Sequence, residues 1–372
     1  MKVIKEIFFG GRLKIFLILT IHLFIFSSIH LSQAQSLMHK LPVEVIDTGG
    51  TLLFSDSPEY VQRDGILYTD TVTGDARIFY YHLNDTTDRK KIAVIVENVS
   101  NKSTTVEIKR GALAVPSENY FAVGKSLQET YMQDNFHDSF KLKSRERKIL
   151  QPDMDLTIVN PACLVGGVYD IYSKQPVRIF VLMYPEYAEP LNFLQTAEIL
   201  PKDEQRLRGT FKRYNRTIKL QDAFDPAKNG IGYILIGEDV NDTFRKGIDA
   251  TDNSEVVNVG NYGINYQIEF RTKSPTKFLL TPLGGVYSGA VKVKYNSDLG
   301  MIPTPRDKLF FGENTPPESE SVRIAREEGL AFFTNVLELT ELGIYSGKVF
   351  FEYSPPGASN LPVQIILLPA EG

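Results

Sequence analysis

The acidic segment GEDVNDTFRKGIDATDNSE, residues 237–255, has the best-defined ligand chemistry in the sequence. Carboxylate and amide oxygens of this kind bind Ca²⁺, which takes about six to eight oxygen ligands. The candidate ligands are Asp239, Asn241, Asp242, Asp249 and Asp252. Their spacing is not that of an EF-hand loop, and Arg245 and Lys246 interrupt the acids. The segment therefore predicts a solvated turn with weak Ca²⁺ binding or none, and no other cofactor is expected.

A second segment, PSENYFAVGKSLQETYMQ, places aromatic side chains near a predicted loop. Tyr120, Phe121 and Tyr131 are the candidates there for a surface that binds a glycan or a protein. The sequence contains 18 Tyr, 23 Phe and no Trp. Most of the Tyr and Phe residues lie in predicted strands, where they are expected to form the core.

Catalytic signatures are weak. The sequence has no Gly-x-Ser-x-Gly elbow and no Walker loop, and its carboxylates show no pairing that singles out a glycosidase site. The single cysteine, Cys163, lies in the apolar stretch NPACLVGG, which favours a buried and inert thiol. We therefore expect no catalytic residues and a protein that is not an enzyme.

The elements that must position these residues are strands. Short segments rich in Val, Ile, Phe and Tyr alternate with Gly, Pro and Asn turns, and they include KIAVIVEN, TTVEIKR, VRIFVLMY, AVKVKYN and VQIILLP. The best helix candidate begins near Ser319, in SESVRIAREEGLAFF. This pattern predicts an all-β fold made of sandwiches or barrels.

The chain also repeats itself at a nearly constant separation. The matched pairs are Gly74 with Gly260, Tyr80 with Tyr266, Val106 with Val291, Pro116 with Pro303, Gly124 with Gly312 and Gly166 with Gly347. Their separations run from 181 to 188 residues, which is the length of a domain rather than of a solenoid repeat. We predict two tandem antiparallel β-sandwiches, of the jelly-roll type or a related one, that arose by duplication. Their expected bounds are 40–187 and 207–372, joined by a linker at 188–206.

The first 34 residues have the pattern of a secretory signal. Four basic residues precede the apolar run IFLILTIHLFIFSSIHL, and Ser32 and Ala34 supply the small residues that a signal peptidase reads. We predict cleavage after Ala34; the alternative is an uncleaved membrane anchor. A secreted chain with one cysteine has no disulfide framework, so its cores must be held by packing. The formal net charge of −4 gives no basic surface for nucleic acid.

Two segments carry a resemblance. Residues 208–266, which contain RGTFKRYNRTIKL and KGIDATDNSEVVNVGNYGINY, and residues 55–84 resemble uncharacterised secreted proteins of spore-forming and related bacteria. Some of those proteins are labelled as copper amine oxidase N-terminal domain-containing. That domain and the catalytic motif are absent here. The tyrosines in ENYFA and GNYGI are followed by the wrong residue for quinone formation, and His39, His82 and His137 are far apart.

The resulting hypothesis is an exported, non-catalytic protein of the cell envelope or extracellular space. It would act as a structural or adhesive module that binds a cell-wall or extracellular polysaccharide or a protein through sheet edges or loops. The alternative is a carbohydrate-binding module or a glycan-processing enzyme.

Overall fold

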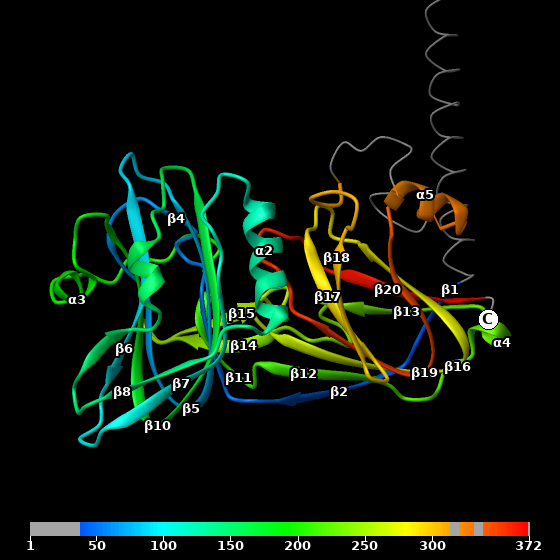
Figure 1. Ribbon diagram of the computed structural model, residues 1–372, viewed down its shortest axis with the longest axis horizontal. Coiled ribbons are helices and arrows are strands. Elements are labelled where there is room, and N and C mark those ends of the chain that lie inside the picture. Colours follow the sequence, from blue (N-terminus) through cyan, green and yellow to red (C-terminus); the bar gives the residue numbers. More distant parts are fainter. Residues whose placement is uncertain (1–37, 313–319, 331–337, 371–372) are drawn as a thin grey trace, which may run out of the picture.

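The computed structural model describes residues 38–312, 320–330 and 338–370, and the chain there forms two large β-sheets, here called sheet A and sheet B (Figure 1). The predicted all-β fold is confirmed. The sheets are mixed, however, and not purely antiparallel as expected. Among the strands of the described residues, four pairs are parallel: β1 with β13, β3 with β5, β4 with β5 and β12 with β16. Whether two strands pair parallel or antiparallel depends on how distant segments meet in the fold. The alternation of residues along one strand does not specify this.

Sheet A forms the right-hand body in Figure 1 and follows the order β1-β13-β20-β16-β19-β17-β18, with β12 pairing to β16 and β2. Its strands are β1 (Met38–Lys40), β2 (Val43–Thr48), β12 (Asn215–Leu220), β13 (Ile231–Ile236), β16 (Asn265–Pro282), β17 (Gly289–Tyr295), β18 (Asp298–Thr304), β19 (Thr340–Tyr353) and β20 (Val363–Pro369).

Sheet B follows the order β15-β14-β11-β3-β5-β10-β6-β9, with β4 pairing to β5 and β7 pairing to β10 and β8. Its strands are β3 (Thr51–Ser55), β4 (Tyr60–Val61), β5 (Gly65–Asn84), β6 (Lys90–Asn98), β7 (Thr104–Leu113), β8 (Asp138–Leu142), β9 (Arg147–Ile149), β10 (Leu164–Pro185), β11 (Arg208–Lys212), β14 (Arg245–Asp249) and β15 (Ser254–Asn258). The helices are α2 (Tyr120–Gln133), α3 (Pro190–Phe193), α4 (Pro226–Asn229), α5 (Glu320–Glu327) and the 3₁₀ helix η1 (Pro152–Leu156).

The two sheets exchange strands across the predicted domain boundary. From the first half of the chain, β1 and β2 join sheet A, where they pair with β13 and β12. From the second half, β11, β14 and β15 join sheet B, where β11 pairs with β3. The bounds 40–187 and 207–372 stay a prediction, and the ladders show that strands on either side of the linker are shared between the two sheets.

The predicted duplication stays a prediction, because the strand pairs in the two sheets differ. A shift of 186 residues, which matches Tyr80 to Tyr266, places β5 on residues 251–270 and β10 on residues 350–371, whereas β16 and β19 span Asn265–Pro282 and Thr340–Tyr353. In sheet B the extra residues at the break in register lie in β10, between Ser173 and Val177. In sheet A they lie in β16, between Thr272 and Thr276, and β16 is the strand that the repeat matches to β5.

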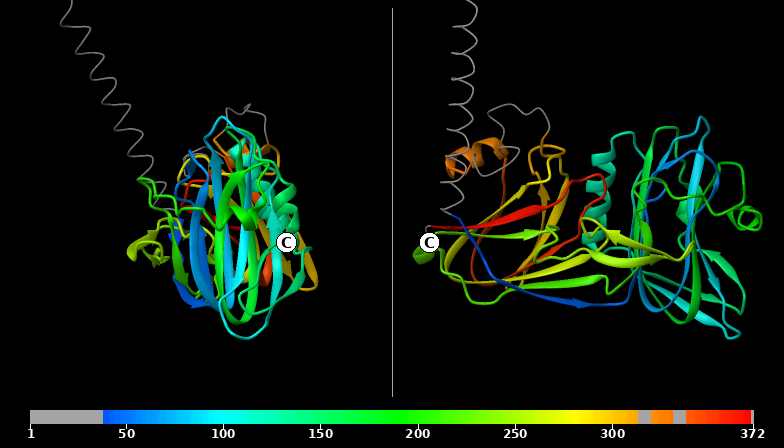
Figure 2. Two further views of the ribbon diagram at one scale, coloured as in Figure 1. Left: turned by 90° about the vertical axis from the view of Figure 1, so that its left-hand side faces the viewer. Right: turned by 180° about the vertical axis from the view of Figure 1, so that it is seen from behind.

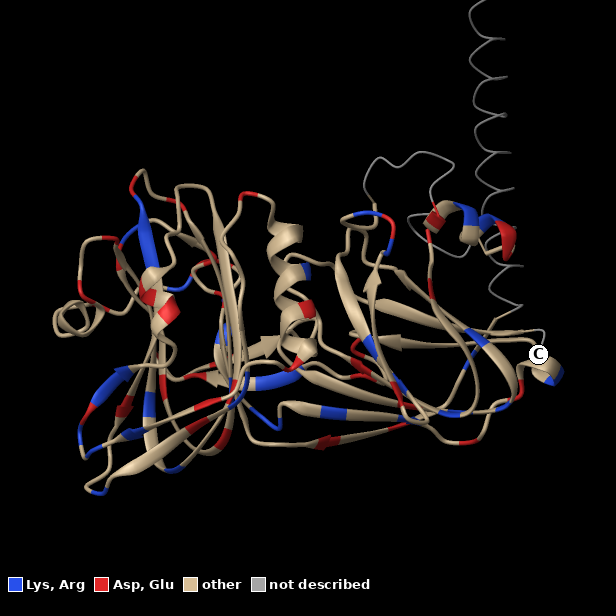
Figure 3. Cartoon of the chain, viewed as in Figure 1, with Lys and Arg blue, Asp and Glu red and all other residues tan. Residues whose placement is uncertain are grey.

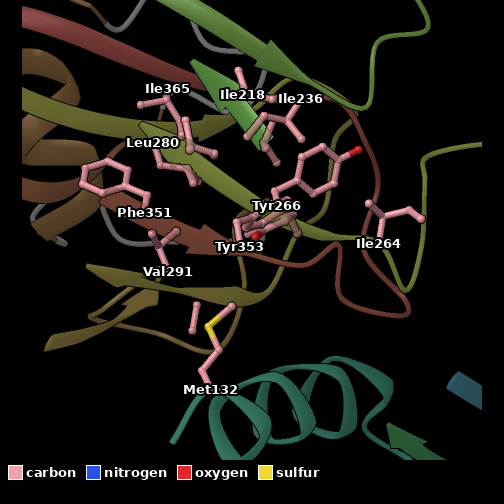
Figure 4. Packing of buried hydrophobic residues seen from close by; sticks show 14 of the residues in the cluster. Met132, Ile218, Ile236, Ile264, Tyr266, Leu280, Val291, Phe351, Tyr353 and Ile365 are labelled. Atoms are coloured by element: carbon pink, nitrogen blue, oxygen red, sulfur yellow. The ribbon is translucent and has the colours of Figure 1, made fainter. Parts of the chain in front are cut away.

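The core is divided by sheet B. Along β5, Ile78 and Tyr80 point into a cluster shared with β6 and β10, whereas Phe79 and Tyr81 point into the cluster that fills sheet A. A strand buried on both faces reads as a nearly continuous apolar run, and ARIFYYHL does so. Figure 4 shows the second cluster, in which Tyr266, Phe351 and Val291 of sheet A lie near Met132 of α2.

Helix α2 stands between the two bodies in Figure 1 and again in the view from behind in Figure 2. This segment was expected to lie near a loop. Asn119 caps the helix, since its side-chain oxygen accepts a hydrogen bond from the Ala122 N–H at 3.2 Å. Its buried residues recur at helical spacing: Val123, Gly124, Leu127, Gln128, Tyr131 and Met132. The helix therefore buries one face of its side chains between the two sheets.

The other predicted helix is confirmed as α5, although its proposed cap, Ser319, lies outside the described residues. The predicted signal segment, residues 1–34, also lies outside them. Within the described ranges, no helix combines the length and the apolar character needed to cross a bilayer.

Candidate functional site

A pocket opens where sheet B meets the connection between β19 and β20. Its volume is about 250 Å³, and it is lined by residues of β3, β5, the turn after β3, the segment before β11 and the turn before β16. In Figure 1 the red connection between β19 and β20 runs beside α2 at this junction. The approach is close: a Cβ on Gly357 would lie 2.6 Å from the Tyr81 ring, so only glycine fits there.

The turn that follows β3 carries the two acidic residues of the pocket, Asp56 and Glu59. A buried histidine, His82 of β5, holds this turn. Its Nδ1 lies 2.8 Å from the carbonyl oxygen of Pro58, which can only accept, so Nδ1 carries the proton. Its Nε2 then accepts from the Ser55 hydroxyl at 2.9 Å. Burial lowers the pKa of His82 to about 4, which keeps the ring neutral at physiological pH.

A second support comes from the segment before β11. The Asp203 carboxylate accepts hydrogen bonds from the Ser57 hydroxyl and from the Glu59 N–H, both at 2.8 Å. The Asp56 N–H donates to the Leu207 carbonyl at 3.1 Å. The acidic turn is thus fixed on both sides before any ligand is present, which is the condition for a preorganised site.

The electrostatics of the pocket are unusual for a carboxylate pair. Burial raises the pKa of Asp56 well above its ordinary value, and the charges of Glu59 and Asp203 raise it further. Burial, followed by the charge of Asp203, also raises the pKa of Glu59. Asp56 is partly buried as a residue, and its Oδ1 atom is buried without a hydrogen-bond partner among the described residues.

Aromatic rings form the walls. Phe54 stacks on Phe79 with ring centroids 5.3 Å apart, and on Tyr262 at 6.4 Å. The hydroxyl of Tyr262 donates to the Ser359 carbonyl at 2.6 Å, and that of Tyr81 donates to the Tyr120 carbonyl at 3.0 Å. Because both hydroxyl groups are occupied, these tyrosines present ring surface to the pocket.

Residues 55–84 carry a resemblance, but no pattern in the sequence predicted the pocket that they help to form. The available signal was Asp56 and Glu59 three positions apart in a Ser-Pro turn directly after an apolar strand. That signal is common in solvated turns. Its meaning depends on Tyr262 and Gly357, which lie roughly 200 and 300 residues further along the chain and which no local pattern connects to it.

The predicted calcium ligands are not brought together. Asp242 is buried and binds Arg216, and its Oδ2 accepts from the Tyr266 hydroxyl at 2.8 Å. Asp249 is buried against Arg208 at 2.8 Å. The prediction of a solvated turn is therefore wrong for these two residues, which are parts of internal ion pairs.

The remaining acids of that segment have separate partners. Asp239 Oδ1 accepts from the Phe244 N–H at 2.7 Å, and Asp252 binds Lys202 at 2.6 Å. Within the described part of the chain, no three His, Cys, Asp or Glu residues are placed to hold a metal ion.

The three predicted surface aromatics have different positions. Phe121 stacks on Phe310 with centroids 4.2 Å apart, and Tyr120 is partly buried beside the pocket. Tyr131 is wrong as a surface residue, because it is only 2% exposed. Its hydroxyl donates to Asp170 at 2.7 Å and contacts Arg77. Tyr131 lies on the buried face of α2, which the expectation of a loop did not foresee.

The other residues considered for chemistry are dispersed. Cys163 is buried, as expected, and burial raises the pKa of its thiol. His39 and His137 are exposed, on β1 and before β8 respectively. Figure 3 shows basic and acidic residues interspersed along both bodies of the molecule.

An open groove of about 550 Å³ lies on the face of sheet A. Two of its three charged side chains already have partners: Lys292 donates to the Met132 carbonyl at 2.7 Å, and Glu352 binds Arg110. The Asp56 pocket is smaller, but no residue in the described part of the chain donates a hydrogen bond to its buried Asp56 Oδ1 atom. We therefore take that pocket as the candidate site.

Comparisons with known proteins add little. No family model and no curated protein matches the sequence. The CUB1-EGF-CUB2 fragment of human MASP-1/3 aligns at 9% identity over 88% of this chain and 99% of that one, with a TM-score of 0.18. A cupin 2 conserved barrel domain protein from Leptotrichia buccalis aligns at 7% identity over 88% and 90%, with a TM-score of 0.14. Likeness this low carries no information about the function of the chain.

Proposed function

We propose that the chain is an exported, non-catalytic binding protein of the bacterial cell envelope. Its pocket would hold a small polar group that belongs to a cell-wall polysaccharide or to an envelope protein. The observation that carries the proposal is the acidic turn, which presents Asp56 and Glu59 to an aromatic-walled cavity. Concave sites with apolar walls and a few fixed polar groups are the usual form of ligand sites.

The unsatisfied carboxylate supports binding over a purely structural role. A buried acceptor without a partner costs about 1–3 kcal/mol, and most buried polar groups in proteins are hydrogen-bonded. Such a group is retained where a ligand supplies the missing donor. The N-terminal basic, apolar and small-residue pattern supports export.

A glycan-processing enzyme is the second candidate, and the same residues favour it. A carboxyl group whose pKa is raised by burial and by a neighbouring carboxylate can remain protonated and act as a general acid. Asp56 would be that acid, with Glu59 as the second carboxylate. The two candidates differ in whether the polymer is altered.

Both candidates are tested on purified bacterial cell walls with the chain that begins at residue 35. We expect the protein to sediment with the walls and to release no soluble sugar or peptide. The double variant Asp56→Asn, Glu59→Gln should lose most of this retention. The variant Asp222→Asn, which changes an exposed carboxylate elsewhere, is the matched control and should behave as wild type.

The outcomes separate the candidates. Release of soluble fragments by wild type, but not by Asp56→Asn, would replace the binding proposal with the enzymatic one. Absence of retention by wild type, or equal retention by the double variant, would overturn the assignment of this pocket.

A further inference from the structure

We propose that the pocket recognises a primary ammonium group carried on a sugar ring or on a short aliphatic chain. The inference rests on the proposed binding function and names the ligand chemistry of the same site. Three observations support it: the charge of the lining residues, the Asp56 Oδ1 atom without a donor, and the aromatic walls.

The charge balance of the pocket is one-sided. Its lining residues include two carboxylates, Asp56 and Glu59, and no Lys, Arg or His. Elsewhere in the described chain, enclosed carboxylates are neutralised within the protein: Asp249 by Arg208 and Asp242 by Arg216. An occupant that brings a positive charge would do the same for the acidic turn, because opposite charges attract strongly in a partly desolvated site.

Asp56 also lacks a donor. The neighbouring Asp203 accepts hydrogen bonds from Ser57, from the Glu59 N–H and from the Arg206 N–H at 3.1 Å. Asp56 Oδ1, by contrast, is buried without a partner among the described residues. An ammonium group has three donors and no acceptor, so it fits a site in which carboxylate oxygens dominate.

The walls suit the same ligand. The rings of Phe54, Phe79, Tyr81 and Tyr262 line the cavity, and the two tyrosine hydroxyls are already bonded to carbonyl groups. Aromatic faces attract cations within about 6 Å and also pack against the apolar face of a ring or chain. A volume of about 250 Å³ limits the occupant to one sugar ring or one side chain.

Other ligand classes fit less well. An anion would be repelled by both carboxylates, and a neutral sugar would leave their charge uncompensated. The ammonium group has two sources in an envelope, an amino sugar and a lysine-like side chain, and the experiment distinguishes them.

Binding is measured by titration calorimetry at about pH 6.5, where amines are protonated. The first probe pair is glucosamine against glucose, and the second is Nα-acetyl-lysine against Nα,Nε-diacetyl-lysine. In at least one pair we expect the amine to bind at least tenfold more tightly than its neutral partner. Asp56→Asn should reduce that affinity at least tenfold, Glu59→Gln should reduce it less, and Asp222→Asn should leave it unchanged. Melting temperatures confirm that the variants are folded.

The pair that shows the preference identifies the source. Equal binding of glucose and glucosamine, abolished by Asp56→Asn, would overturn the ammonium inference and leave the binding function standing. Failure of all four probes, with retention on cell walls intact and dependent on Asp56, would also overturn it. Failure of the probes together with loss of retention would overturn both proposals.

Discussion

Aspartates lie inside the molecule in two regions, and the regions differ in whether an arginine binds the carboxylate. Between sheets A and B, Asp242 is 1% exposed and contacts the Arg216 guanidinium, which also binds Asp47 at 2.8 Å. In the pocket, Asp56 has neighbours that are carboxylates and aromatic rings. The arginine lowers the pKa of Asp47, whereas burial and like charge raise that of Asp56.

The difference separates structure from function. A buried aspartate with a buried arginine has its charge and hydrogen bonds satisfied within the fold, so it fixes the position of segments such as β12 and the turn after β13. An aspartate that the fold leaves unsatisfied destabilises the protein and is kept where another molecule completes it. Substitutions in the two regions should therefore have opposite effects on stability.

The largest effect is expected for Arg216→Met. The change leaves Asp242 buried without its cationic partner, and breaking such a pair costs about 3–5 kcal/mol. Urea unfolding monitored by circular dichroism would measure the loss. The exposed pair of Arg63 and Glu198 provides the control, because Arg63→Met should change stability by at most about 1 kcal/mol.

A compensating change sharpens this test. Adding Asp242→Asn to Arg216→Met removes the unpaired charge and should restore part of the lost stability. If the double variant is less stable than the single one, the cost of Arg216→Met does not come from a stranded carboxylate.

The opposite sign is expected for Asp56→Asn. At neutral pH it should raise the free energy of unfolding by about 1–3 kcal/mol, because it removes a partly buried negative charge that Glu59 and Asp203 repel. The same variant should lose ligand binding. Thermal unfolding at pH 7 would measure the gain, and a loss of stability would show that Asp56 is satisfied within the fold.

The pH dependence follows from the direction of the pKa shift. The folded protein holds the Asp56 proton more tightly than the unfolded chain, whose pKa is near 3.8. This contribution to stability is complete below that value and is lost as the pH rises through the folded pKa. Wild type should therefore lose more stability than Asp56→Asn above about pH 4. Glu59 adds a smaller slope of the same sign in both proteins.

A smaller effect is expected for Tyr131→Phe. The hydroxyl bridges Asp170 and Arg77, and Arg77 also donates to the Gly263 carbonyl at 3.1 Å, which links sheet B, α2 and the turn before β16. Its removal should cost about 1 kcal/mol. Retention on cell walls should not change. A selective loss of retention without a loss of stability would restore Tyr131 as a binding residue.

Sequence alone was sufficient for the features that local patterns encode. Alternating apolar residues predicted the strands, because that signal lies within one segment. The repeat inferred from pairs such as Gly74 and Gly260 stays a prediction. Helix α2 was missed since its apolar stripe contains Gly124, whose lack of a Cβ allows the Gly357 carbonyl to approach. The pocket was also missed because it depends on contacts between distant segments. Its walls come from segments that meet only after both sheets have formed.

The smallest effect on the melting temperature is expected for calcium. This prediction again concerns the aspartates that are paired with arginines. If Asp242 and Asp249 serve arginines, they are not free to bind a cation, so millimolar CaCl₂ should leave the melting temperature unchanged. Asp249→Ala should lower the melting temperature equally with and without calcium, because it strands Arg208, which Asp249 contacts at 2.8 Å. A stabilisation by calcium that disappears in Asp249→Ala would mean that the ion displaces Arg208 from Asp249. In that case, pairing with an arginine would no longer distinguish a structural aspartate from one that binds a ligand.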